Sequence, residues 1–253
     1  MLALAQTPSL RMDYGVRTYV AREPIDFAQV LAQHAGYCRT LANCGAAVRI
    51  LEINSHFADG VFIEDTAVVL DEVAILASMG TASRRGEPAG IEQVLREYRE
   101  VLRVDPAVML EGGDVLQVGK SLLAGLSSRT NAAGVAALAA IAGRFGYSVQ
   151  SVTVRGCLHL KTACTALPGG RLLVNPAWVE LSALRGYELV FVPGEEPWAA
   201  NVALLGSAVL LAAAHKRTAE LIAKLGIATR PVDISEFAKA EGGVTCLSLI
   251  FAE

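Results

Sequence analysis

Five polar side chains recur along the sequence at intervals of 42 to 48 residues, each near the start of an apolar hairpin. They are Asp65, Glu111, His159, Asn201 and Cys246. A thiol, an imidazole and carboxylates together suit nucleophilic catalysis, in which the thiolate attacks, the imidazole moves a proton and a carboxylate orients the imidazole. The common spacing indicates equivalent positions in a repeated unit, so we predict that these side chains converge on one central pocket.

A single buried cysteine usually packs as a small hydrophobic residue. Cys246 lies in EGGVTCLSLIF, three residues after Gly243, and the pair Gly242 and Gly243 lets the backbone approach a ligand closely. His159 shares its spacing and begins an apolar strand, where an unpaired imidazole would be costly to bury. The shared spacing therefore favours a place for both residues in the central pocket over a purely structural role.

The other cysteines show no pattern that binds a metal or forms a redox pair. No C-x-x-C pair and no closely spaced set of cysteines and histidines occurs in the sequence. We interpret the remaining four as structural: Cys38, Cys44, Cys157 and Cys164. Free thiols of this kind favour a reducing cytoplasm, and we expect neither a metal nor a cofactor.

Composition excludes several classes of function. Hydrophobic residues make up 53% of the chain and charged residues 19%, which excludes a disordered protein. The net charge of −3, with acids and bases interspersed, predicts no binding to nucleic acid or to an anionic membrane. The longest apolar run, residues 201–214, is too short to cross a bilayer, and the opening residues do not read as a signal peptide. A small-molecule substrate fits best, and a homodimer stays open.

Two arginines occupy matching loops, each just before a predicted helix. Arg84 lies in ASRRGE and Arg129 lies in SSRTN. The neighbouring Ser, Thr and Asn residues suit helix N-caps. Two guanidinium groups above one pocket also suit the binding of a carboxylate, which arginine contacts in a bidentate manner that lysine cannot match.

The elements that would position these residues follow a repeat of about 45 residues. Apolar segments alternate at strand period in four predicted hairpins, at residues 61–79, 112–126, 159–176 and 199–214. Helical spacing follows at 87–102, 131–146 and 215–226, and strands are predicted at 148–154, 187–192 and 229–234.

A fifth unit begins with the strand at 245–251, and the rest of that unit must come from the other end of the chain. Residues 2–6 would pair with it, followed by a helix at 26–45 and a strand at 47–53. No Pro/Ser-rich linker divides the sequence, so we predict one α/β domain spanning residues 1–253. It would consist of five β-β-α-β units with pseudo-fivefold symmetry, closed by pairing of the N- and C-terminal strands.

The motifs FIEDTAVV, SRRGE, EGGD, SSRTN, LHLKT, AAN and GGVTCLS, in this order, resemble those of the dimethylarginine dimethylaminohydrolase family. The resemblance runs from about residue 5 to the C-terminus. It implies the five-bladed α/β propeller of the guanidino-modifying superfamily. It also implies hydrolysis of Nω,Nω-dimethyl-L-arginine and Nω-methyl-L-arginine to L-citrulline and dimethylamine or methylamine, through a covalent thiouronium on cysteine.

The same resemblance implies roles for individual residues. Cys246 matches the nucleophile, His159 the proton donor and acceptor, and Glu111 the acid that orients the histidine. The residues implied in substrate binding are Asp59, Glu64, Asp65, Arg84, Arg129, Val16 and the main chain of Ala240. Glu64 and Asp65 would hold the guanidinium, Arg84 and Arg129 the carboxylate, and Asp59 the α-amino group. Val16 would belong to an N-terminal lid loop.

Alternative functions remain at this stage. A related enzyme could act on arginine, agmatine or another ω-substituted arginine with the same nucleophile and histidine. The same propeller also serves a ribosome-binding protein without catalysis, for which the set of Cys, His and acids would have no use. A thiol-based redox or zinc-buffering protein would want neighbouring resolving cysteines, which the sequence lacks.

Overall fold

The computed structural model describes residues 1–253 and is built from short strands with helices between them. The strands are β1 (Leu2–Gln6), β2 (Ala47–Leu51), β3 (Ala67–Val69), β4 (Val73–Leu76), β5 (Glu100–Arg103), β6 (Val115–Val118), β7 (Ser121–Leu126), β8 (Ser148–Thr153), β9 (Cys164–Leu167), β10 (Arg171–Val174), β11 (Glu188–Phe191), β12 (Val202–Leu205), β13 (Ala208–Ala212), β14 (Ala228–Val232) and β15 (Ser248–Phe251). The α-helices are α1 (Phe27–Asn43), α2 (Glu87–Leu95), α3 (Ala132–Ala142), α4 (Leu160–Ala163), α5 (Lys216–Lys224) and α6 (Ser235–Ala238).

These strands form five three-stranded sheets of the same design. Their orders are β15-β1-β2, β3-β4-β5, β6-β7-β8, β9-β10-β11 and β12-β13-β14. In every sheet the middle strand pairs antiparallel with the strand before it in this order and parallel with the strand after it. The predicted α/β fold of five repeated units is therefore confirmed.

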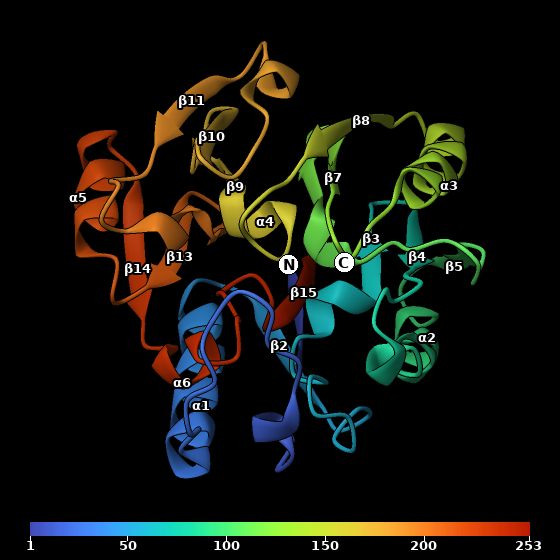
Figure 1. Ribbon diagram of the computed structural model, residues 1–253, viewed down its shortest axis with the longest axis horizontal. Coiled ribbons are helices and arrows are strands. Elements are labelled where there is room, and N and C mark those ends of the chain that lie inside the picture. Colours follow the sequence, from blue (N-terminus) through green and yellow to red (C-terminus); the bar gives the residue numbers. More distant parts are fainter.

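The sheets lie around a common centre, with helices α1, α2, α3 and α5 on the outside of the molecule (Figure 1). The first strand of each unit is the innermost: β6 contacts β9, β9 contacts β12, and β15 contacts β3. Apolar side chains from adjacent elements form five separate buried clusters. Each cluster lets a short sheet bury the surface that it could not bury alone.

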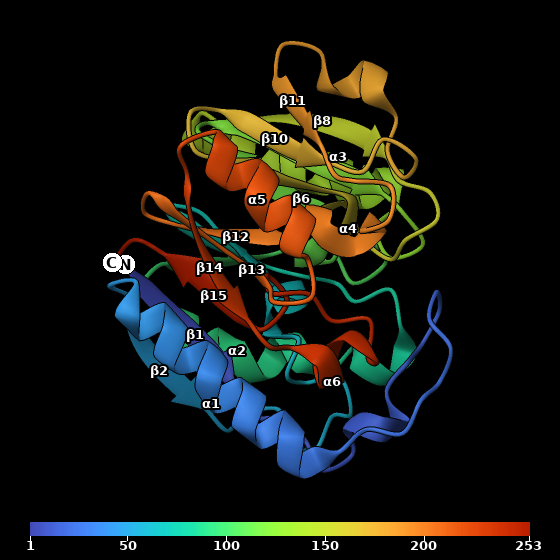
Figure 2. The ribbon, with the colours of Figure 1, turned by 90° about the vertical axis from the view of Figure 1, so that its left-hand side faces the viewer.

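The two ends of the chain share one sheet, as the sequence predicted. β1 pairs antiparallel with β15, from Leu2 opposite Phe251 to Ala5 opposite Ser248. Figure 2 shows the two termini next to each other at one face of the molecule. All residues of β1 are buried, because it is the central strand of its sheet. Cys246 lies two residues before β15, so this pairing sets the position of the thiol.

One predicted helical segment is wrong in part. The segment at 87–102 is helical only in α2, and its end forms strand β5, which pairs parallel with β4. Residues 177–186, for which no helix was predicted, contain only the short 3₁₀ turn η6 (Leu181–Leu184). Helical spacing persists locally through residues 96–102, but the hydrogen bonds offered by the open edge of β4 outweigh that local preference.

The polar residues of the repeat lie on short turns and not on the first strands themselves. The turns are η2 (Ile63–Thr66), η4 (Gly112–Asp114), α4 and η7 (Pro197–Ala200). His159 is the extended residue directly before α4, so its predicted position at the start of a strand is wrong. A helical turn at this point bends the chain away from the strand direction and leaves backbone N–H groups available for hydrogen bonds with side chains.

None of the helices has the length and apolar character needed to span a lipid bilayer.

Candidate active site

One small cavity near the centre collects most of the residues that the sequence singled out. Its lining consists of Val16, Asp59, Phe62, Asp65, Arg84, Arg129, Leu158, His159, Ala240, Glu241 and Cys246. The cavity has a volume of about 20 Å³, which is room for about one water molecule. Of the predicted site residues, only Glu64 and Glu111 do not line it.

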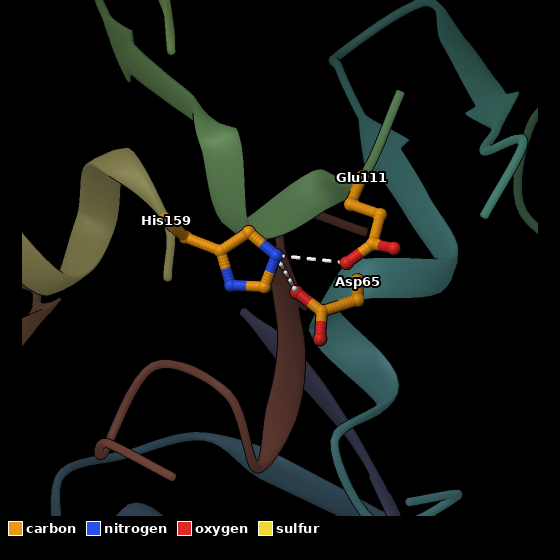
Figure 3. Close-up of side chains that lie close together, drawn as sticks. All are labelled: Asp65, Glu111 and His159. Atoms are coloured by element: carbon orange, nitrogen blue, oxygen red, sulfur yellow. Dashed lines mark hydrogen bonds and ion pairs between the residues drawn. The ribbon is translucent and has the colours of Figure 1, made fainter. Parts of the chain in front are cut away.

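His159 is held between two carboxylates, as Figure 3 shows. Its Nε2 lies 2.8 Å from Glu111 Oε2 and 3.8 Å from Asp65 Oδ1. Glu111 is fully buried behind the imidazole, and Gly80 N–H donates a hydrogen bond of 3.0 Å to its Oε1. The other ring nitrogen of His159 points away from both carboxylates (Figure 3). Glu111 therefore orients the ring and leaves that second nitrogen free for chemistry.

The charges around His159 favour its protonated form. Burial by itself lowers the pKa of the imidazole, but Asp65 and the hydrogen bond to Glu111 outweigh burial and raise the pKa to about 9. Burial likewise favours the neutral form of Asp65, yet the cations of His159 and Arg84 lower the pKa of that carboxyl. At neutral pH the site thus holds an imidazolium next to carboxylates.

Cys246 lies on the turn before β15 and is partly buried, with access through the cavity. Gly243 N–H donates a hydrogen bond of 3.3 Å to its Sγ, and its backbone C=O accepts one from Glu64 N–H. Burial, together with the charges of Glu64 and Asp65, raises the pKa of the thiol to about 12. The thiol is therefore protonated at neutral pH.

Arg84 is bound on several sides. Its Nη1 lies 2.7 Å from Asp65 Oδ2, and its Nε and Nη2 both donate to the carboxylate of Glu87 at 2.8 to 3.1 Å. Nη2 also donates to Phe62 C=O at 3.0 Å. The partners raise the pKa of Arg84 well above its usual value although burial opposes them. One N–H of Nη1 keeps no partner.

Arg129 is much less constrained than Arg84. The only hydrogen bond of its guanidinium joins Nη1 to Glu111 Oε1 at 3.5 Å, and Arg129 lines the cavity. The two arginines that were predicted as an equivalent pair thus differ in how many partners hold their guanidinium groups. Arg129 has most of its donors available to a ligand.

Glu64 faces away from the cavity. Its carboxylate lies 2.6 Å from Lys161 Nζ and accepts a hydrogen bond of 2.7 Å from Thr245 Oγ1. Asn201, the amide of the repeat, donates to Thr245 Oγ1 and accepts from Thr245 N–H. This network fixes the turn that carries Cys246. Asn201 and Glu64 therefore hold the thiol in position through Thr245, the residue before it.

The N-terminal loop, residues 7–20, reaches the cavity through Val16, and we call it the lid loop. Val16 N–H donates a hydrogen bond of 3.2 Å to Asp59 Oδ2. Gly15 lies so close to Asp59 that a Cβ at this position would be 2.2 Å from its Oδ1. The contact between Val16 and Asp59 therefore depends on a glycine in the loop.

Several residues of the site escaped the sequence reasoning. Glu87 holds Arg84, Lys161 holds Glu64, Asp114 accepts from Leu160 N–H at 2.8 Å, and Glu241 contacts the lid loop. Glu87 lies in SRRGE and Lys161 in LHLKT, so both were inside quoted motifs. Only the spatial partner of each shows its role.

Three side chains at the centre offer metal-ligand atoms close to one another. Ligand atoms of Asp65, Glu111 and His159 all lie within 4.8 Å. In the structure these atoms are already engaged in the hydrogen bond and ion pairs around the imidazole. The expectation of no metal stays a prediction.

Comparison with known proteins places this geometry in a family. Residues 58–184 match the arginine deiminase family. The chain is 40% identical over 253 residues to the N(G),N(G)-dimethylarginine dimethylaminohydrolase of Streptomyces coelicolor, covering 99% of this chain and 97% of that protein. It is 34% identical over 250 residues to the enzyme of the same name from Pseudomonas aeruginosa, covering 98% of both.

The chain belongs to the dimethylarginine dimethylaminohydrolase family. A solved structure of the Pseudomonas aeruginosa protein, a cysteine-to-serine variant complexed with citrulline, superposes with a TM-score of 0.93 at 33% identity. The match covers 98% of both chains. The family resemblance found in the sequence motifs is therefore confirmed, and so is the family's fold.

Proposed function

We propose that the protein hydrolyses Nω,Nω-dimethyl-L-arginine, and Nω-methyl-L-arginine, to L-citrulline and dimethylamine or methylamine. The observation that carries this proposal is the shared cavity of Cys246 and His159, in which an anionic and a cationic side chain, Asp65 and Arg129, also meet. The named relatives and the citrulline complex support the same reaction. The reaction class is hydrolysis of a C–N bond in an amidine.

The polar groups of the cavity suit the two ends of a substituted arginine. Asp65 is the carboxylate of the cavity next to Cys246 and His159, so it suits the guanidinium. Arg129 suits the α-carboxylate, because its donors are mostly unpaired. Asp59 and the main chain of Ala240 suit the α-amino group, and Val16 suits a contact from the lid loop.

The nucleophile in this proposal is the thiolate of Cys246. A guanidinium carbon is a weak electrophile because three nitrogens share the charge, so a strong nucleophile is needed. Negative neighbours raise the pKa of the thiol to about 12 in the free protein. A substrate cation between those carboxylates offsets their charge and lowers the pKa of the thiol. The thiol then releases its proton to solvent, and the thiolate attacks.

His159 supplies the proton that the leaving amine needs. Attack forms an S–C bond and a tetrahedral intermediate, and the imidazolium then protonates the dimethylamine nitrogen as its C–N bond breaks. A thiouronium remains on the sulfur. The neutral imidazole next takes a proton from water, which attacks the same carbon. Collapse breaks the S–C bond, releases L-citrulline and restores the thiol.

The lid loop must move for a substrate to enter. The present cavity holds about one water molecule, far less than an arginine derivative requires. Closing over the bound substrate would exclude bulk water and strengthen the charge interactions of the site. In this scheme Glu64 does not line the cavity. Its negative charge acts on the thiol of Cys246, and its hydrogen bond with Thr245 fixes the turn before that cysteine.

An assay of citrulline release tests the proposed function directly. Asymmetric dimethylarginine, monomethylarginine, arginine and agmatine are compared in parallel, with Cys246→Ser as the inactive control. We expect turnover of the two methylated substrates and none in Cys246→Ser. Release from arginine alone would point to a deiminase. Preference for agmatine would contradict the role of Arg129, because agmatine has no carboxylate. Inactivity on all four would favour a binding protein.

Cellular location and domain organisation belong to the same proposal. All five cysteines are free thiols, and a thiol nucleophile must stay reduced, which supports a cytoplasmic location. The five sheets follow one another without an intervening linker, which supports one catalytic domain over residues 1–253. The sequence leaves a homodimer open. Neither a metal nor an organic cofactor is required by the steps above.

A further inference from the structure

Six charged groups alternate in sign through the centre of the molecule. In order they are Glu87, Arg84, Asp65, His159, Glu111 and Arg129. The contacts along this row measure 2.8, 2.7, 3.8, 2.8 and 3.5 Å. All six groups are buried. Because charges interact strongly away from water, a change at one end of the row affects its centre.

Glu87 is the terminal acid of the row and lies outside the cavity. Burial raises its pKa to about 7 although Arg84 opposes that shift, so the carboxylate is an anion above neutral pH, and the kinetics below are measured at pH 8. Its side chain is 0% exposed, and its residue begins helix α2, where the helix dipole favours a negative charge. Its carboxylate contacts the Nε and Nη2 of Arg84 with both oxygens. Glu87 therefore acts on the site through Arg84.

Arg84 contacts two carboxylates, those of Asp65 and Glu87, and only Asp65 lines the cavity. Asp65 Oδ2 contacts Arg84 Nη1, while Asp65 Oδ1 accepts from Gly113 N–H at 3.1 Å and faces His159. Without Glu87, the whole positive charge of Arg84 would fall on Asp65. A carboxylate neutralised in this way attracts a substrate guanidinium less strongly.

We propose that Glu87 is a positioning residue for the proposed reaction: it holds Arg84 and shares its charge, which keeps Asp65 available to the substrate guanidinium. This inference rests on the proposed function. It goes further in assigning part of substrate binding to a carboxylate that never touches the substrate. His159 depends on the same balance, because its cation is stabilised by the charge that Asp65 retains.

Steady-state kinetics with asymmetric dimethylarginine gives the first test. Glu87→Gln keeps the shape of the side chain and removes its charge. We expect KM to rise by about tenfold, the effect of losing one charge-assisted contact, with kcat changed by less than about threefold. Glu87→Asp keeps the charge and should restore part of the loss. Wild-type KM in Glu87→Gln would overturn the proposal.

Glu92→Gln is the matched control. Glu92 lies on the same helix, is also buried, and pairs with Arg96 at 2.7 Å on the outer side of the molecule. It touches no member of the charge row. We expect wild-type KM in this variant, and a KM increase equal to that of Glu87→Gln would overturn the specific role of Glu87.

The second test follows the titration of His159 by NMR in the absence of substrate. Removing the negative charge of Glu87 makes the surroundings of the imidazole more positive, so its pKa should fall by at least about half a unit in Glu87→Gln. A loosened fold alone has no reason to shift this one histidine while leaving His56 unchanged. An unmoved His159 titration would overturn the charge-sharing argument.

The two tests separate this inference from the proposed function. If the wild-type protein turns over none of the arginine derivatives, the proposed function fails, and the His159 titration still decides whether Glu87 controls the charge row. If Glu87→Gln does not fold, the same two measurements are made on Glu87→Asp. Aspartate is one methylene shorter, so its carboxylate lies farther from Arg84 and should shift the KM and the His159 pKa in the same direction but by less. A wild-type KM together with a wild-type titration would overturn the proposal.

Discussion

At the scale of single residues, the two arginines of the site differ in how many hydrogen bonds and ion pairs their guanidinium groups make. Arg84 is bound to Asp65, Glu87 and a backbone carbonyl, whereas Arg129 makes one contact of 3.5 Å. Arg84 compensates two buried carboxylates, and its removal leaves Glu87 without a cation and Asp65 with only the imidazolium of His159. Arg129 leaves one weak contact behind. The first arginine therefore supports the fold and the second suits a ligand.

Substitution of each arginine by alanine should separate these roles. We expect Arg84→Ala to lower the free energy of unfolding by about 3–5 kcal/mol, the usual cost of breaking a buried ion pair. Arg129→Ala should lose less than about 1 kcal/mol, yet raise KM by at least about tenfold. Urea denaturation and steady-state kinetics measure the two effects. Equal loss of stability in both variants would contradict the distinction.

The reactivity of Cys246 follows from its anionic surroundings. In the free protein its thiol has a pKa raised to about 12 by burial and by Glu64 and Asp65. Alkylation by iodoacetamide should therefore be slow at pH 7 and rise steadily through pH 10 without a plateau. Mass spectrometry of the alkylated peptide follows the rate, with Cys246→Ser as the control. A plateau near pH 8 would show a thiol of ordinary acidity.

At the scale of elements, Glu241 holds residues 18–20 of the lid loop through its side chain, and its own backbone is strained. Glu241 has φ of 61°, and no other residue besides glycines has a positive φ. Its carboxylate accepts hydrogen bonds from the backbone N–H groups of Thr18, Tyr19 and Val20. Three charge-assisted hydrogen bonds offset the cost of a left-handed backbone, about 1–2 kcal/mol. Glu241 also follows Ala240 directly, so the lid loop and the cavity wall are joined.

Loss of the Glu241 carboxylate should release the lid loop. In Glu241→Ala we expect trypsin to cleave after Arg17 several times faster, because the loop opens more often. Glu241→Gly should show the same release and be more stable than Glu241→Ala, since glycine adopts the positive φ without strain. Glu195→Ala serves as the control, because this exposed carboxylate pairs with Arg217 and makes no hydrogen bond to the loop. Unchanged cleavage in both Glu241 variants would show that other contacts close the lid.

At the scale of the whole molecule, the central ion pairs link folding to pH. The pKa of His159 is 6.5 in its ordinary state and about 9 in the folded protein. A raised pKa means that the folded state binds the proton more tightly. The resulting stability is complete below pH 6.5 and is lost as the pH rises through 9. The charge row at the centre therefore holds the five units together best near neutral and mildly acidic pH.

Urea denaturation between pH 6.5 and pH 9.5 measures this linkage. We expect the wild-type protein to lose on the order of 3 kcal/mol over this range through His159. His159→Asn cannot bind that proton, so its stability should change distinctly less with pH. The same slope in both proteins would assign the pH dependence to other groups.

The repeated unit, the pairing of the two termini and the residue types at the centre can all be predicted from the amino-acid sequence. These features are local or periodic: alternation predicts strands, and equal spacing places Asp65, His159 and Cys246 at equivalent positions. Seven motifs in order then sufficed for the family. Hairpins at residues 61–79 and 112–126 were also predictable, because Asp71, Glu72 and Gly119 lie at their turns.

The partner of each charged group, in contrast, follows from the tertiary structure. Arg84 and Arg129 occupy matching loops in the sequence, yet Glu87 binds only Arg84. The end of the predicted helix at 87–102 became strand β5 because an edge of β4 lay open to it. Glu241 reaches the lid loop across more than two hundred residues of sequence. Such choices depend on distances between segments that the fold brings together, and no local pattern of residues encodes those distances.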